Sequence, residues 1–145
     1  MSDLDPADLA ARFRQALVPL VRKLRTNVEE GMSPSLMSAL ATVAREERVT
    51  LTDLANIEKV SPPMATKLAN GLEERGLVTR VACADDKRVT RLELTKAGRA
   101  MLDRSHKRRN AWLAKKLAAL SEDERIAIAE SIAVIERLNR EDLGR

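Results

Sequence analysis

The feature that most constrains the fold is a run of helix, turn and strand signals between residues 50 and 95. Thr50 and Asp53 have the spacing of a capping box, in which each side chain satisfies a free backbone N–H at a helix start. Leucine and alanine then recur at helical spacing, and residues 57–60 leave room only for a tight turn. The sequence therefore predicts a short helix and a turn that lead directly into a second helix.

The second helix is predicted over residues 61–75. Ser61 is a good N-cap, and Pro62 suits the first helical position, where a missing N–H costs nothing. Gly76 suits the position just after the helix end. The spacing of the apolar residues predicts one buried stripe. We expect Met64, Ala65, Leu68, Ala69 and Leu72 to be buried and Pro63, Thr66, Lys67, Asn70 and Glu73 to face outward.

A β-hairpin is predicted after the second helix. Residues 77–81 and 89–94 carry β-branched side chains, and apolar and charged residues alternate in the second run. Residues 83–88 between them are polar enough to form a projecting, charged loop. Residues 48–50 are interpreted as a short third strand of the same sheet.

This order of elements matches the surface of duplex DNA. One exposed helix fits the major groove, and a basic hairpin tip fits the narrower, more negative minor groove beside it. Residues 61–110 hold twelve basic and six acidic residues, a net charge of +6, whereas the rest of the chain contributes −2 to the total of +4. The positive charge is thus concentrated where the predicted fold would meet DNA.

At these residues the sequence resembles the winged helix-turn-helix of the MarR (multiple antibiotic resistance regulator) family of bacterial transcription factors. The stretches that carry the likeness are SPPMATKLANGLEERGLVTR, DDKR and LELTKAG. In the family they are a serine-started recognition helix and its exit, an Asp-x-Arg wing, and a Leu-Thr-x-x-Gly entry to a long dimerisation helix. Met64 departs from the pattern, since many members carry a polar residue there. The matching residues are Ser61, Leu72, Glu73, Gly76, Leu77, Val78, Arg80, Asp86, Arg88, Leu94, Thr95 and Gly98.

Polar and basic residues of the second helix and the hairpin are the predicted DNA contacts. Lys67 is expected to bind a phosphate, and Asn70 to pair with adenine if the helix enters the groove deeply. Arg88 is expected to enter the minor groove, because a guanidinium sheds its hydration more easily than an ammonium. Asp86 is expected to hold that arginine or a neighbouring backbone amide. The predicted DNA-binding residues are Ser61, Pro62, Pro63, Thr66, Lys67, Asn70, Lys87, Arg88 and Arg91.

Helical segments flank this region on both sides. Apolar spacing predicts an amphipathic helix from about residue 5 to residue 30, with a kink at Pro19, and Ser33 opens another helix. After the hairpin, Thr95 caps a long helix and Ser121 a last one. The predicted fold is mainly α with a small β-hairpin wing (α+β). The chain is expected to be a single domain, 1–145, with a winged helix-turn-helix DNA-binding lobe at 33–94 (recognition helix 61–75, wing 77–94) and a helical dimerisation region at 5–30 and 95–143.

The first and last helices carry more apolar surface than one small lobe can cover. Ile128, Ile132 and Ile135 mark such a stripe on the last helix. We therefore expect these helices to pair with the same elements of a second copy in a two-fold homodimer, as the family resemblance also implies. Such a dimer places two recognition helices about one DNA turn apart, roughly 34–36 Å, and implies a pseudo-palindromic operator.

Composition excludes several other functions. The 145 residues are 44% hydrophobic and 33% charged, as in a soluble globular protein. Phe13 and Trp112 are the only aromatic residues, which argues against stacking on single-stranded nucleic acid. His106 is the only histidine, and no Cys/His cluster or catalytic motif is present. No metal, cofactor or enzyme activity is therefore expected.

The single cysteine, Cys83, excludes an internal disulfide and suits a reducing cytosol. The acidic N-terminal residues lack the apolar core of a signal peptide, and no stretch approaches the length of a membrane span. A cytoplasmic protein that does not enter a membrane is expected. Cys83 lies where the strand meets the wing and is interpreted as a plain small residue, with an oxidant-sensing thiol as the alternative.

The family resemblance implies a repressor that leaves DNA when a small aromatic or anionic ligand enters a cleft between the dimer helices and the lobe. The alternative from a different class is an architectural DNA-binding protein with little sequence preference. A helical module that docks a protein is a third interpretation, but it gives no reason for the basic tip. No effector-binding residue is assigned, although residues available to line the cleft are Leu17, Val21, Met32, Met37 and Trp112, with Arg14 or Arg22 for a carboxylate.

Overall fold

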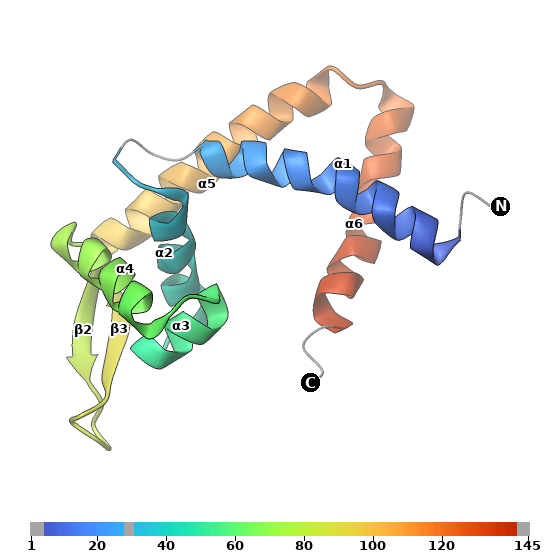
Figure 1. Cartoon of the computed structure of the whole chain (residues 1–145). Coiled ribbons are helices and arrows are strands. Elements are labelled where there is room, and N and C mark those ends of the chain that lie inside the picture. Colours follow the sequence, from blue (N-terminus) through green and yellow to red (C-terminus); the bar gives the residue numbers. More distant parts are fainter. Residues whose placement is uncertain (1–4, 28–30, 142–145) are drawn as a thin grey trace. The chain divides into compact units, whose positions relative to one another are not determined.

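A computed structural model of the chain describes residues 5–27 and 31–141. Its contacts divide the chain into two compact units, residues 1–109 and 110–145. The mainly helical fold with a small antiparallel sheet confirms the predicted fold class (Figure 1). The elements are α1 (Pro6–Thr26), α2 (Pro34–Glu46), β1 (Val49–Thr50), α3 (Leu51–Glu58), α4 (Pro62–Glu74), β2 (Val78–Ala82), β3 (Thr90–Leu94), α5 (Lys96–Ala118) and α6 (Glu122–Glu141).

In the first unit, α2, α3 and α4 pack with a three-stranded sheet, and β2 and β3 project from it as a hairpin (Figure 1). The strands lie in the order β1–β3–β2, all antiparallel, and Val49 of β1 pairs with Leu92 of β3. The short third strand predicted at residues 48–50 is therefore confirmed at Val49–Thr50, without Arg48. Removal of apolar side chains from water drives this packing. Leu40, Leu54, Leu72 and Leu92 are completely buried at its centre.

Side-chain caps begin the helices where the sequence predicts them. Thr50 Oγ1 accepts a hydrogen bond from the Asp53 N–H at 3.1 Å, and Asp53 Oδ2 accepts one from the Thr50 N–H at 3.0 Å. These two bonds form the predicted capping box at the start of α3. Ser61 Oγ caps α4 by accepting from the Met64 N–H at 3.3 Å. The predicted caps at Ser33, Thr95 and Ser121 are also present.

The turn between α3 and α4 is shorter than predicted. Residues 57 and 58 belong to α3 rather than to the turn. Lys59 then takes a left-handed backbone conformation, with φ at 54°, and the Val60 N–H bonds back to the Ala55 carbonyl at 3.0 Å. The helix ends at this reversal because the last free carbonyls are satisfied there.

The predicted buried stripe of α4 is confirmed at four of its five positions. The prediction that Met64 is also buried is wrong. Its side chain is 41% exposed. Met64 lies about a quarter turn from the centre of the stripe, so it points along the edge of the helix rather than into the core. The buried positions are Ala65, Leu68, Ala69 and Leu72.

A close backbone contact holds the hairpin against the start of α5. Thr95 Oγ1 donates to the Gly76 carbonyl at 2.6 Å, just after the end of α4. A Cβ added to Gly98 would lie 2.2 Å from the Leu77 carbonyl oxygen, far inside van der Waals contact. Only glycine therefore lets the first turn of α5 approach so closely. Leu102, one turn further on, is buried in the core of the lobe.

α1 and α6 expose large apolar side chains in the single chain. α1 has no buried residue; it continues through Pro19 and ends at Thr26, so its predicted end at residues 28–30 lies outside the described residues. The limits predicted for the lobe and for the dimerisation region stay predictions. The exposed apolar residues are Leu9, Phe13, Val18, Leu20 and Val21 on α1 and Ile126, Ile128, Ile132, Val134 and Leu138 on α6.

Candidate nucleic-acid interface

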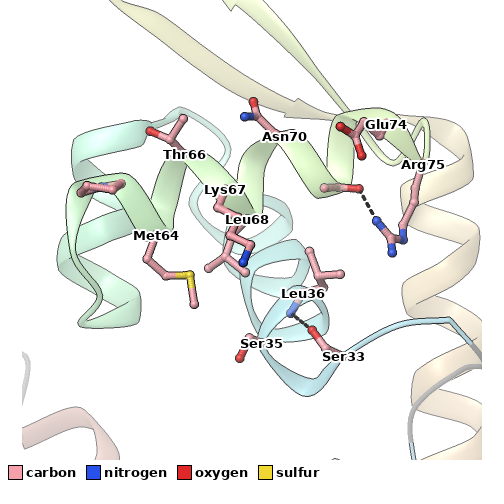
Figure 2. A pocket seen from close by; sticks show the side chains of 12 residues that line it. Ser33, Ser35, Leu36, Met64, Thr66, Lys67, Leu68, Asn70, Glu74 and Arg75 are labelled. Carbon is pink, nitrogen blue, oxygen red and sulfur yellow. Dashed lines mark hydrogen bonds between the residues drawn. The ribbon is translucent and has the colours of Figure 1, made fainter.

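The exposed face of α4 presents six of the residues that the sequence places at DNA. Thr66 Oγ1 donates to the Pro62 carbonyl at 3.1 Å, which leaves the hydroxyl oxygen able to accept a bond from outside. Thr66 and Asn70 point to one side of the helix, and Met64 points to the other (Figure 2). The six exposed residues are Ser61, Pro62, Pro63, Thr66, Lys67 and Asn70.

Arg80 joins this face of α4 to the sheet. One terminal nitrogen of Arg80 donates to Asn70 Oδ1, and Arg80 Nε lies 3.3 Å from Glu73 Oε2. Arg80 belongs to β2, where it pairs with Leu92 of β3. The sequence marks Arg80 only as part of the family pattern, because the distance between a strand residue and a helix side chain depends on how the two elements pack.

Arg88 is a strongly exposed cation of the wing. The side chain of Arg88 is 92% exposed, and Asp86 Oδ1 lies 3.2 Å from its Nε. The same carboxylate oxygen accepts from the Arg88 backbone N–H at 3.0 Å. The Val89 N–H closes the turn by donating to the Asp86 carbonyl at 3.0 Å. Asp86 therefore both shapes the tip and orients its arginine.

The other predicted wing residues differ in exposure. Lys87 is exposed at the tip, whereas Arg91 is only half exposed, since it lies within β3 between Thr50 of β1 and Val81 of β2. Cys83 is buried at the end of β2, where its backbone N–H donates to the Val89 carbonyl at 2.9 Å. The thiol thus lies inside the base of the wing rather than on its surface.

A groove of about 660 Å³ runs between α4 and the first turn of α2 (Figure 2). Its apolar lining includes Leu36 and Leu68, and the cation Lys67 also lines it. Arg75 lies at one end, where its guanidinium donates to the Gly71 carbonyl at 2.9 Å and to the Gly31 carbonyl at 3.4 Å. This second bond links the end of α4 to the segment that precedes α2.

The residues available to line an effector cleft that belong to the first unit lie in two different surroundings. Met32 and Met37 are buried in the core of the lobe. Trp112 belongs to the second unit, where Lys116 Nζ lies 5.6 Å from the centre of its ring. A shallow hollow of about 420 Å³ on α1 does bring together Leu17, Val18, Val21, Arg22 and Arg25.

Residues 5–27 and 31–141 contain no cluster of three His, Cys, Asp or Glu side chains that could hold a metal ion. None of the helices in the same residues is both long enough and apolar enough to cross a membrane.

A capped and exposed helix beside a hairpin with a basic tip, both supported by one core, defines a winged helix-turn-helix protein. The MarR family model matches residues 32–90, which extend from just before α2 to the first residue of β3. With the relatives described next, this match shows that the chain belongs to the MarR family. It is a DNA-binding transcriptional regulator.

Similar proteins extend the match over most of the chain. A helix-turn-helix (HTH)-type transcriptional regulator of Mycobacterium tuberculosis is 35% identical over 126 residues, 86% of this chain and 87% of the relative. The HTH-type transcriptional repressor MdtR of Bacillus subtilis is 26% identical over 92% of this chain and 83% of its own length. A solved structure from Pseudomonas aeruginosa, 29% identical, has a TM-score of 0.82 and covers 92% of this chain and 94% of that chain. The family and the two named relatives are regulators rather than enzymes.

Proposed function

We propose that the protein is a homodimeric, cytoplasmic repressor that binds a pseudo-palindromic operator and is released from it by a small aromatic or anionic ligand. The observation that carries the proposal is the combination of an exposed, capped α4 with the 92% exposed side chain of Arg88 on the neighbouring hairpin. In this proposal α4 enters the major groove and Arg88 enters the minor groove beside it.

The proposed contacts divide into phosphate binding and base reading. The capped start of α4 favours a phosphate, because its first backbone N–H groups carry the positive end of the helix dipole. Lys67 and Lys87 add charge at phosphates, while Asn70 and Arg88 face base edges. The complete set remains Ser61, Pro62, Pro63, Thr66, Lys67, Asn70, Lys87, Arg88 and Arg91, with Asp86 orienting the wing.

The homodimer is supported by the apolar side chains that α1 and α6 expose in one chain. Each helix presents five such side chains, which is more than a scatter of single apolar residues on a surface. A two-fold dimer would bury the same residues from both copies. It would also place two copies of α4 about one DNA turn apart, roughly 34–36 Å.

Repression and ligand release have separate support. MdtR, 26% identical over most of the chain, is named as a repressor. The hollow on α1 combines the apolar Leu17 and Val21 with Arg22 and Arg25, a chemistry that suits an aromatic carboxylate. A ligand that binds better when the two copies of α4 are wrongly spaced would weaken DNA binding by that difference in affinity.

The other interpretations have less support. An architectural protein needs no oriented side chains, whereas Asp86 and Arg80 orient Arg88 and Asn70. An oxidant sensor needs a reachable thiol, whereas Cys83 is only 6% exposed.

Binding to DNA from just upstream of the protein's own gene, against random duplex of equal length, tests the proposal. The comparison should run from about 50 to 200 mM salt, because phosphate contacts weaken steeply over that range. Tight binding confined to the upstream fragment supports a sequence-reading repressor. Equal and steeply salt-dependent binding to both fragments favours the architectural alternative. Selection from a random DNA pool then shows whether the protein prefers any sequence.

A further inference from the structure

Arg80 reaches from β2 to the outward face of α4 and holds the side chain of Asn70. Its terminal nitrogen donates to Asn70 Oδ1, and its Nε lies 3.3 Å from Glu73 Oε2. The side chain of Arg80 is only 28% exposed, whereas Asn70 and Glu73 are exposed. The guanidinium is therefore held between strand and helix by Asn70 and Glu73.

This contact decides which way the Asn70 amide faces. Arginine has N–H donors and no acceptor, so the amide atom that it touches is the carbonyl oxygen. The NH₂ group of Asn70 is then left to donate elsewhere, and among the described residues no hydrogen bond occupies it. Figure 2 shows Asn70 standing clear of the helix on the side away from Met64. The Asn70–Arg80 pair thus presents donors to whatever lies outside α4.

Adenine and guanine differ in the hydrogen bonds that their major-groove edges can make with such a pair. Adenine pairs with asparagine by donating from N6 to the carbonyl oxygen while N7 accepts from the amide nitrogen. That arrangement would bring the adenine amino group to an oxygen that already accepts from a guanidinium. Adenine would have only the second lone pair of that oxygen, and its amino hydrogens would lie beside a positive charge. Guanine instead presents two acceptors, O6 and N7.

We infer that Asn70, oriented by Arg80, reads guanine rather than adenine in the operator. Arg80 is then a positioning residue for base choice. The inference rests on the proposed function, because it requires α4 to lie in the major groove. It replaces the adenine contact that an asparagine alone would suggest.

Selection of operators from a random duplex pool tests this assignment. The unaltered protein should enrich guanine at one base pair of each half-site, and Asn70→Ala should abolish the preference at that base pair alone. Arg80→Met should lower the ratio of guanine to adenine there on the order of tenfold. Arg45→Met, which removes an equally positive and 62% exposed side chain from α2, is the matched control and should leave the ratio unchanged.

Arg80→Met also removes the ion pair with Glu73, so two substitutions at the exposed Asn70 test the orientation independently. Asn70→Lys keeps donors and should retain guanine, whereas Asn70→Asp keeps only acceptors and should lose it. If both Asn70 variants lose the preference for guanine at unchanged Tm, the inference is contradicted. An unchanged ratio of guanine to adenine in a folded Arg80→Met protein also contradicts it. Adenine at the Asn70 position contradicts the inference alone, whereas a pool with no enriched sequence contradicts the proposed function.

Discussion

Asp86 Oδ1 accepts two hydrogen bonds from Arg88, one from the backbone N–H at 3.0 Å and one from Nε at 3.2 Å. An ion pair between groups this exposed adds little to folding stability. Its effect is geometric, because a side chain already held in one direction loses less conformational freedom when it binds. The pair therefore prepares the tip of the wing for an anionic partner.

Replacing Arg88 with alanine should lower operator affinity about tenfold or more while the protein stays folded, because a cation is lost from the groove. Lys87→Ala is the matched control, since it removes one positive charge from the same tip. It should weaken binding almost equally on every sequence and reduce the salt slope by about one. Fluorescence anisotropy at several salt concentrations measures both. Unchanged affinity and salt slope in Arg88→Ala would contradict the role given to this arginine.

Replacing Asp86 with alanine should lower affinity less than Arg88→Ala does, because the arginine is present but no longer oriented. In the Arg88→Ala background the same change removes only a negative charge near DNA, so affinity should then rise slightly. The sign change in this double-mutant cycle measures the coupling of the two residues. Identical effects of Asp86→Ala in both backgrounds would show that the carboxylate does not act through Arg88.

Replacing Gly98 with alanine should destabilise the fold by about 1–3 kcal/mol, because the new Cβ meets the Leu77 backbone carbonyl at 2.2 Å. Gly71→Ala is the control, since its Cβ would lie 3.1 Å from the end of the Leu36 side chain and at an ordinary contact distance, 3.6 Å, from the Arg75 guanidinium. The Leu36 side chain can move, and alanine favours a helix over glycine. Urea unfolding should therefore show a clear loss for Gly98→Ala and almost none for Gly71→Ala. Equal stabilities would mean that the start of α5 does not lie so close to the hairpin.

Replacing Ile132 with lysine should convert a dimer into a monomer, because Ile132 is 50% exposed in one chain and lies in the proposed interface. Ile57→Lys is the control: Ile57 is 39% exposed on α3, outside that interface. Sedimentation velocity at micromolar concentration distinguishes the two states. A 16 kDa species for the unaltered protein, or a dimer that tolerates Ile132→Lys, would count against the proposed assembly.

Local signals account for the part of the fold that the sequence predicts well. The capping box of Thr50 and Asp53 and the N-cap at Ser61 depend only on residues three positions apart, and both are present. Even the two-residue strand at Val49–Thr50 follows from β-branched residues next to a turn. Family motifs place the helix, the hairpin and the start of α5 in the right order.

The features that the sequence does not predict depend on distances between elements. Met64 was expected in the core because its spacing fits a helical stripe, but burial at the edge of a stripe depends on the neighbouring element. The contact of Arg80 with Asn70 joins residues from β2 and α4, and no pattern in either segment predicts it. The extent of α3 depends on the left-handed conformation of Lys59, a non-glycine residue for which that conformation is uncommon.

Hydroxyl-radical footprinting of the protein on its operator tests most directly whether α4 and the wing of two copies read one symmetric site. Two equal protected segments should appear about one helical turn apart. Each should have minor-groove protection at one edge that disappears in Arg88→Ala, while the protection of the backbone beside α4 persists at higher protein concentration. A single asymmetric segment, or protection spread evenly along any DNA, would contradict a dimeric regulator that reads sequence through these two elements.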